Sequence, residues 1–123
     1  MRVRIGLAMF VLLGLGVALG SQLNQFGIAD SQQVTFSTAV KIGDTLVPAG
    51  DYKVLHTMQG EDHIMLFEQQ GVPKSKAGYA KVKCTLKQLD EAARTNEARF
   101  RNESGVEILT LLQFKGDKAQ HVF

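Results

Sequence analysis

Several residue types are scarce in this sequence, and each scarcity excludes a class of protein. The chain of 123 residues contains one cysteine and two prolines. A single cysteine excludes an intramolecular disulfide scaffold and a zinc site built from several cysteines. Two prolines exclude a proline-rich linker, and 21% charged with 45% hydrophobic residues excludes a disordered polyelectrolyte. The chain is therefore long enough, and apolar enough, for one ordinary domain.

Recognisable catalytic motifs are missing as well. The sequence has no Gly-x-Ser-x-Gly elbow, no His-Glu-x-x-His helix, no phosphate-binding loop of the Walker type and no dinucleotide fingerprint. The acidic residues Asp44, Asp51, Glu61 and Asp62 all fall at predicted turns, where short acidic side chains commonly bond to their own backbone. We therefore expect a protein that is not an enzyme.

Charged residues are absent from Ile5 to Leu19, a run that follows arginines at positions 2 and 4. This layout is typical of a secretory signal peptide. Small residues at Ala18 and Gly20 predict cleavage before Ser21, so that residues 1–20 are a leader. The apolar run is shorter than the ~20 residues that cross a bilayer, which favours a cleaved leader with no transmembrane span remaining. We expect a periplasmic or extracellular protein, and the short charged region is typical of bacterial leaders.

Once the leader is removed, the chain has no excess of positive or negative charge. The loss of Arg2 and Arg4 leaves 12 basic and 12 acidic side chains. Nucleic-acid binding needs clustered excess positive charge, so the sequence indicates no nucleic-acid partner. An envelope component or a small ligand is the kind of partner that we expect.

Hydrophobic residues follow a period of two through most of the remaining chain, which predicts half-buried strands. We expect strands at about 33–42, 45–47, 52–57, 63–68, 80–89, 97–101, 106–115 and 120–123. Good helix formers at residues 89–95 predict one short helix. Seven or so short strands without a repeating strand-helix unit predict a single antiparallel β-sandwich or small β-barrel. The domain is expected to span residues 33–123, preceded by a polar tail at residues 21–32.

One local pattern resembles a recurring element of small uncharacterised exported bacterial β proteins. In Pro48-Ala49-Gly50-Asp51-Tyr52 a strand ends in Pro-Ala-Gly and an aromatic residue opens the next strand. The ending His121-Val122-Phe123 is similar to that of the same proteins. The resemblance implies a small, exported, all-β protein, and it implies no catalytic or ligand residues.

His56 and His63 form the first pair with potential chemistry. A two-residue turn at Gln59-Gly60 would place them directly opposite each other, with Cβ atoms ~5 Å apart, where two imidazoles suit zinc, copper or nickel. A four-residue loop at 59–62 would instead pair His56 with Met65. Both registers fit the sequence equally well.

A metal site normally needs more ligands than this pair supplies. A structural site has four ligands, and His121 is the only further histidine. We therefore expect ordinary strand histidines, no cofactor and no stoichiometric metal, with His56 and His63 as the weak candidates.

Two other features of one predicted strand are candidates for binding or catalysis. Lys81, Lys83 and Lys87 share a face that could attract anions, although lysines on exposed strands also protect against edge aggregation. Cys84 points inward by parity, between Val82 and Leu86, and we expect it to pack as a small apolar residue.

The most consistent functional prediction is an exported non-enzymatic β domain with a binding or structural role in the cell envelope. The first alternative is a small β-barrel that carries an apolar ligand in its lumen. A histidine-dependent metal site or enzyme is the second alternative. Large residues that fill the centre, such as Phe36, Phe67, Phe100 and Phe114, would leave no lumen.

Overall fold

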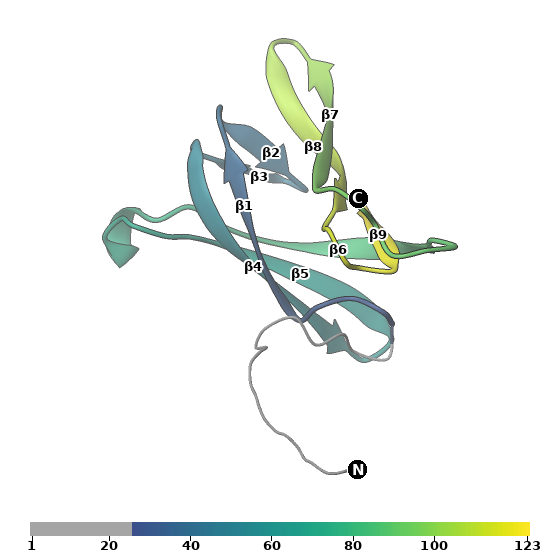
Figure 1. Cartoon of the computed structure of the whole chain (residues 1–123). Helices are drawn as coiled ribbons and strands as arrows, with labels where there is room; N and C mark the ends of the chain where they lie inside the picture. The colour runs from purple at the N-terminus through teal and green to yellow at the C-terminus, as the bar shows by residue number, and fades with distance from the viewer. Residues whose placement is uncertain (1–25) are drawn as a thin grey trace.

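Nine strands and one turn of 3-10 helix make up the computed structural model, which describes residues 26–123 (Figure 1). The elements are β1 (Ser31–Phe36), β2 (Val40–Ile42), β3 (Thr45–Val47), β4 (Gly50–Gln59), β5 (Asp62–Gln69), η2 (Lys74–Lys76), β6 (Tyr79–Gln88), β7 (Glu97–Glu103), β8 (Val106–Gln113) and β9 (Ala119–Val122). The predicted all-β class is confirmed. The predicted signal peptide, its cleavage site and the first part of the tail lie outside the described residues. None of the described residues forms a helix that could cross a membrane.

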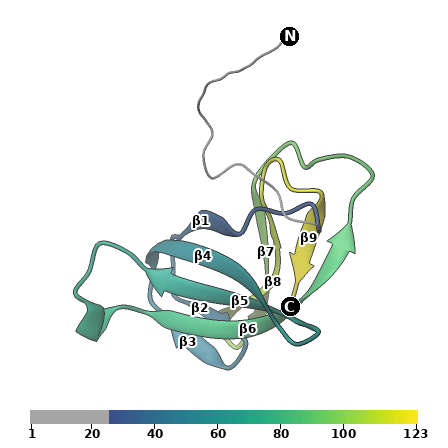
Figure 2. The same ribbon diagram turned by 90° about the horizontal axis from the view of Figure 1, so that it is seen from below.

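The strands belong to one mixed sheet with the order β1-β4-β5-β6-β9-β8-β2-β3, and β7 pairs with β8. All pairs are antiparallel except β2 and β8. The first half of β6 pairs with β5 over residues 79–84, and its second half pairs with β9 over residues 85–88. β6 is therefore shared by two groups of strands, β1-β4-β5 and β9-β8-β7 (Figures 1 and 2).

The core between the two groups of strands is filled by large side chains. Phe36, Tyr52 and Phe67 are buried, with ring centroids of Phe36 at 5.5 Å from Tyr52 and 6.4 Å from Phe67. Phe114 is also buried, whereas Phe100 is 38% exposed and meets the ring of Phe36 edge-on. Three of the four phenylalanines named from the sequence thus lie in the interior, and Phe100 lies at its rim.

The Pro-Ala-Gly-x-Tyr element forms the connection between β3 and β4. The hydroxyl of Tyr52 donates a hydrogen bond of 2.6 Å to the carbonyl oxygen of Pro48. The Tyr52 ring is fully buried, so this bond gives its only polar atom a partner. The ring of Tyr52 therefore packs in the core, and its hydroxyl stabilises the turn.

The predicted first strand is in fact two strands. β1 pairs with β4, whereas β2 pairs with β3 and β8, and residues 37–39 carry the chain from one group of strands to the other. The start also differs, because β1 begins at Ser31 and both Ile28 and Ala29 are buried. The described part of the expected polar tail is therefore packed against the domain.

The helix predicted at residues 89–95 is wrong, because the segment is a loop. Ala93 is buried, and its N–H donates to the carbonyl oxygen of Asp117. The N–H of Gly116 in turn donates to the carbonyl oxygen of Ala93. These long-range backbone bonds satisfy the groups that a helix would have paired locally, which shows how tertiary contacts override a weak local propensity.

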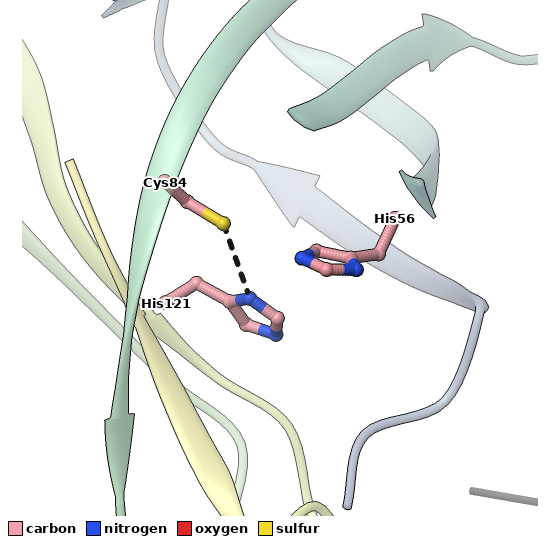
Figure 3. Close-up of side chains that lie close together, drawn as sticks. All are labelled: His56, Cys84 and His121. Carbon is pink, nitrogen blue, oxygen red and sulfur yellow. Dashed lines mark hydrogen bonds between the residues drawn. The ribbon is translucent and has the colours of Figure 1, made fainter. Parts of the chain in front are cut away.

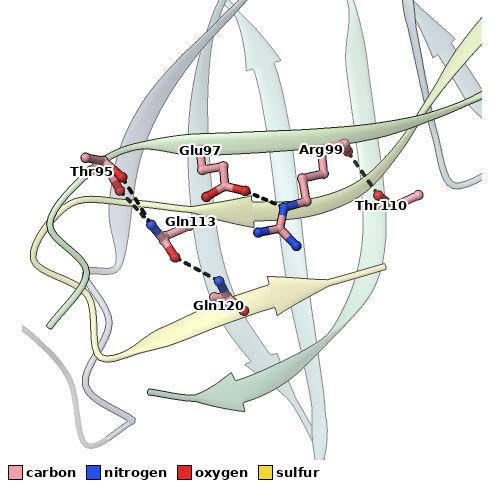
Figure 4. Close-up of polar contacts among 6 residues, drawn as sticks. All are labelled: Thr95, Glu97, Arg99, Thr110, Gln113 and Gln120. Carbon is pink, nitrogen blue, oxygen red and sulfur yellow. Dashed lines mark hydrogen bonds and ion pairs between the residues drawn. The ribbon is translucent and has the colours of Figure 1, made fainter. Parts of the chain in front are cut away.

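Polar side chains tie β9 to β8 (Figure 4). The amide of Gln120 donates to Oε1 of Gln113 at 2.8 Å, and the amide of Gln113 donates to the carbonyl oxygen of Thr95 at 2.9 Å. Between β8 and β7, the hydroxyl of Thr110 donates a hydrogen bond to the carbonyl oxygen of Arg99. The guanidinium of Arg99 is ion-paired with Glu97. The Gln120–Gln113 bond thus links β9 to β8, and the Thr110–Arg99 bond links β8 to β7.

Candidate metal centre

The register of the β4–β5 hairpin determines how His56 and His63 face each other. The structure has the second predicted register, in which His56 lies opposite Met65, and the strands pair up to a turn of only Gly60-Glu61. Gly60 has a φ of 65°, the left-handed conformation that two-residue hairpin turns require at their first position.

This register still brings the two histidines close together. His63 stands two residues from Met65 on β5 and shares its face, so it is a diagonal neighbour of His56. The ring centroids of His56 and His63 are 5.4 Å apart. Diagonal neighbours on one sheet face are within reach of long side chains, so the rings meet although the two residues are not directly opposite.

Cys84 on β6 and His121 on β9 are brought together by the pairing of two distant segments. His121 lies opposite Leu86 in this antiparallel pair, which makes it a diagonal neighbour of Cys84. The Sγ of Cys84 is 3.8 Å from Nδ1 of His121. The predicted inward position of Cys84 is confirmed, and the histidine beside it is a contact that the sequence did not reveal.

His56 completes a group of three donors, His56, Cys84 and His121, which we call the buried cluster (Figure 3). One donor atom from each residue lies within 4.8 Å of the other two. The residues are 7%, 7% and 1% exposed, respectively. The Nε2 atom of His56 is buried and has no hydrogen-bond partner among residues 26–123. The buried cluster thus presents nitrogen and sulfur donors to one another, shielded from bulk solvent.

Asp117 lies at the other ring nitrogen of His121. Its Oδ2 is 3.7 Å from Nε2 of His121 and forms no hydrogen bond within the described part of the chain. Its Oδ1 accepts a hydrogen bond of 3.1 Å from the N–H of Ala29. A carboxylate in this place favours the imidazole tautomer with a proton on Nε2, which leaves the Nδ1 lone pair directed at Cys84.

Residues 27–30 form a strap that joins the end of β4 to the turn before β9. The carbonyl oxygen of Asp30 accepts a hydrogen bond from the N–H of His56, and the carbonyl oxygen of Gly27 accepts one from the N–H of Lys118. Ile28, within the strap, is fully buried. The strap is therefore attached on both sides of the buried cluster.

Burial keeps His56 and Cys84 uncharged at neutral pH. The pKa of His56 is lowered from 6.5 to about 4, first by loss of hydration and then by the neighbouring His121 and His63. The pKa of the Cys84 thiol is raised to about 11, also by loss of hydration. Neutral imidazole is the form that binds metals, whereas the thiol must release its proton to do so.

An open hollow of about 900 Å³ borders the buried cluster at His56. Its wall is formed by the strap and the hairpin: Phe26, Asp30, Leu55, His56, Thr57, Met58, Gln59 and Leu66.

The lysine face predicted on β6 lies on the solvent side of that strand. Lys81, Lys83 and Lys87 are exposed, and Lys83 forms an ion pair of 3.3 Å with Asp62. Each half of β6 pairs with one strand, β5 over residues 79–84 and β9 over residues 85–88, so the expectation that these lysines protect a strand edge stays open. They belong to the opposite face from Cys84 and take no part in the buried cluster.

No family model, curated protein or solved structure shows a significant match to this chain.

Proposed function

We propose that this chain is an exported, non-enzymatic β domain that binds one transition-metal ion in the cell envelope through His56, Cys84 and His121. The observation that carries the proposal is the buried cluster, in which donors from three strands lie within 4.8 Å of one another. Thiolate and imidazole are the ligand types that zinc and copper prefer.

The unpartnered atoms around the cluster support an ion rather than simple packing. A buried polar atom without a hydrogen bond costs about 1–3 kcal/mol, and native proteins contain few of them. The Nε2 of His56 and the Oδ2 of Asp117 are two such atoms at one place. An ion would give the imidazole a partner, and a His121 ring bound through Nδ1 would present its Nε2–H to Asp117.

The spacing of the donors also fits a metal. Bonds of about 2.3 Å to sulfur and about 2.0 Å to nitrogen would hold the two donor atoms about 3.5–3.7 Å apart in tetrahedral or trigonal geometry. The Sγ of Cys84 and Nδ1 of His121 are 3.8 Å apart. Little movement would therefore be needed to bind an ion between them.

This proposal departs from the expectation, based on histidines alone, of no stoichiometric metal. Cys84 adds a thiol donor, and the pairing of β6 with β9 adds His121, so three ligands converge without requiring His63. Export follows from the leader pattern in residues 1–20, and burial of the lone thiol would protect it from oxidation in the envelope.

A cysteine-dependent enzyme is the other reading of Cys84, His121 and Asp117, because a nucleophile, a base and an orienting carboxylate occur in that order at many active sites. A nucleophilic cysteine needs access and a lowered pKa. Cys84 is 7% exposed, so a substrate has little access to its thiol, which disfavours catalysis. The apolar carrier is disfavoured, because Phe36, Phe67 and Phe114 occupy the interior.

Metal content measures the proposed activity directly. Purified metal-free protein is mixed with Zn(II), or with Cu(I) under a reducing atmosphere, and examined by native mass spectrometry and elemental analysis after removal of the excess. We expect one ion per chain in the wild type and in His63→Gln, and its loss in His121→Gln. His63→Gln is the matched control, because His63 neighbours the cluster without belonging to it. Equal loss in both variants, or no ion in the wild type, would overturn the proposal.

Export is tested separately by the mass of the mature N-terminus. We expect a chain that begins at Ser21 and is recovered from the envelope or the medium. A chain that retains Met1 in the membrane fraction would contradict the proposed export.

A further inference from the structure

The surroundings of the buried cluster indicate which metal it holds, an inference that rests on the proposed function. One thiolate and two imidazoles suit both zinc and copper, so the donors themselves do not decide between the two. The fourth ligand distinguishes the two metals. A structural zinc site takes four strong ligands, and a catalytic zinc site keeps a water molecule in the fourth position.

A fourth strong ligand is not in place. Among residues 26–123, the group of His, Cys, Asp and Glu donors that meet at this point consists of His56, Cys84 and His121. Asp117 is the nearest carboxylate to His121, but it lies at Nε2, whereas the thiol of Cys84 lies at Nδ1. Its Oδ1 is already used by the N–H of Ala29.

Two further neighbours carry a metal-binding atom. His63 lies opposite Cys84 but does not belong to the group whose donor atoms are within 4.8 Å of one another. Met65 is the other. It stands directly opposite His56 on β5. Its partner on β6 is Val82, two residues from Cys84 on the same face, so Met65 is also a diagonal neighbour of Cys84. It is 1% exposed and packs in the same core as Cys84. The register therefore offers a thioether, a soft and weak ligand, beside the three strong donors.

We propose that the buried cluster is a mononuclear copper site in which His56, Cys84 and His121 bind the ion and Met65 is a weak axial donor. Two imidazoles and a thiolate in a trigonal array, with a long bond to a thioether, form a set that proteins use for copper. All three strong donors are at most 7% exposed, so an ion between them would be shielded from bulk solvent, which disfavours a zinc site that keeps a water molecule.

The charges nearby fit a divalent ion. Cu(II), the thiolate of Cys84 and the carboxylate of Asp117 sum to no net charge, and Asp117 is 1% exposed. A balanced group of charges is far less costly to bury than an uncompensated one. Asp117 thus has two effects. It favours the tautomer of His121 that binds through Nδ1, and its negative charge offsets part of the charge of the ion.

The test uses the visible spectrum, because a copper–thiolate bond has a signature that simple uptake of copper does not. Metal-free full chain is titrated with Cu(II) and followed by absorption and electron paramagnetic resonance. We expect an intense charge-transfer band that saturates at one equivalent and is absent in Cys84→Ser.

Met65→Leu separates the axial donor from the three strong ligands. Met and Leu have similar volumes, so the exchange costs little stability. We expect the variant to keep one copper and the band, with a shifted reduction potential. Met58→Leu is the matched control, since Met58 is 39% exposed on the same strand as His56, and its potential should equal that of the wild type.

The outcomes distinguish this inference from the proposed function. If one Zn(II) binds per chain and Cu(II) gives no thiolate band, the copper assignment fails and metal binding stands. If neither ion binds, both fail. If Met65→Leu has the same potential and spectrum as the wild type, the assignment of Met65 as a ligand is overturned.

Discussion

Acidification of the metal-free protein tests the environment described for His56. Burial, with smaller contributions from the nearby His121 and His63, lowers the pKa of this imidazole from 6.5 to about 4, against an opposing effect of Asp30 and Asp117. The proton that the ring takes up readily in the unfolded chain is therefore taken up by the folded chain only at much lower pH.

The sign and size of the effect follow from this difference. Between pH 6.5 and about pH 4 the unfolded chain binds more protons at His56 than the folded chain does, so the free energy of unfolding rises with pH in that window. Conversely, the contribution is present above pH 6.5 and is lost as the pH falls through about 4. Each pKa unit corresponds to about 1.4 kcal/mol, so the full loss is about 3 kcal/mol.

Urea unfolding at a series of pH values, followed by circular dichroism, measures this loss. Carboxylates also titrate at the acid end of the range, so the wild type is compared with His56→Gln. Between pH 4 and pH 6.5, the free energy of unfolding should rise more steeply with pH in the wild type than in the variant. The difference should equal the contribution of one histidine with this pKa shift.

Nuclear magnetic resonance gives a second measurement that does not depend on the variant. The His56 ring resonances of the folded protein should titrate near pH 4. A midpoint at or above 6.5, or a stability that rises as the pH falls from 6.5, would refute the description of His56 as a buried neutral ring.

Three further predictions concern other parts of the structure. The thiol of Cys84 has a pKa of about 11 instead of 9.0. A bulky thiol reagent should therefore label the native chain about 100-fold more slowly than the urea-unfolded chain. Rapid labelling of the native chain would contradict the burial of the thiol. Asp117→Asn should weaken metal binding by roughly 10- to 100-fold, because an asparagine no longer orients His121 as a carboxylate does. Metal titration measures the affinity, and an unchanged affinity would show that Asp117 does not position His121. Gly78→Ala should destabilise the fold by about 1–3 kcal/mol, because its Cβ would lie 2.5 Å from the Tyr52 hydroxyl oxygen, and equal urea midpoints for variant and wild type would refute the close contact.

The strands could largely be predicted from the sequence, because half-buried strands impose a local alternation. Tyr52, Val54 and His56 on β4 are buried in turn, with exposed or half-buried residues between them. The break at residues 37–39 could not be predicted, because the period of two continues through it and only the choice of pairing partners divides β1 from β2.

The buried cluster shows the limit of the same approach. The parity of Cys84 indicated that it points inward, and the His56–His63 hairpin could be narrowed to two registers. Neither observation could place His121, since its position depends on β9 pairing with β6, and His121 lies 37 residues after Cys84 in the chain. Asp117 was missed for the same reason, because a turn aspartate next to a glycine carries no sign of burial.

The division of β6 between two groups of strands has a consequence for how the domain folds. His56 and Cys84 belong to β4-β5-β6, strands that follow one another along the chain, whereas His121 comes 37 residues after Cys84. Contacts between distant segments form late, because closing a long loop costs entropy before the contact is made. An intermediate with β4, β5 and β6 in place would have two of the three donors, so an ion would be held firmly only after β9 has docked. A bound ion should therefore slow unfolding and leave the rate of refolding nearly unchanged.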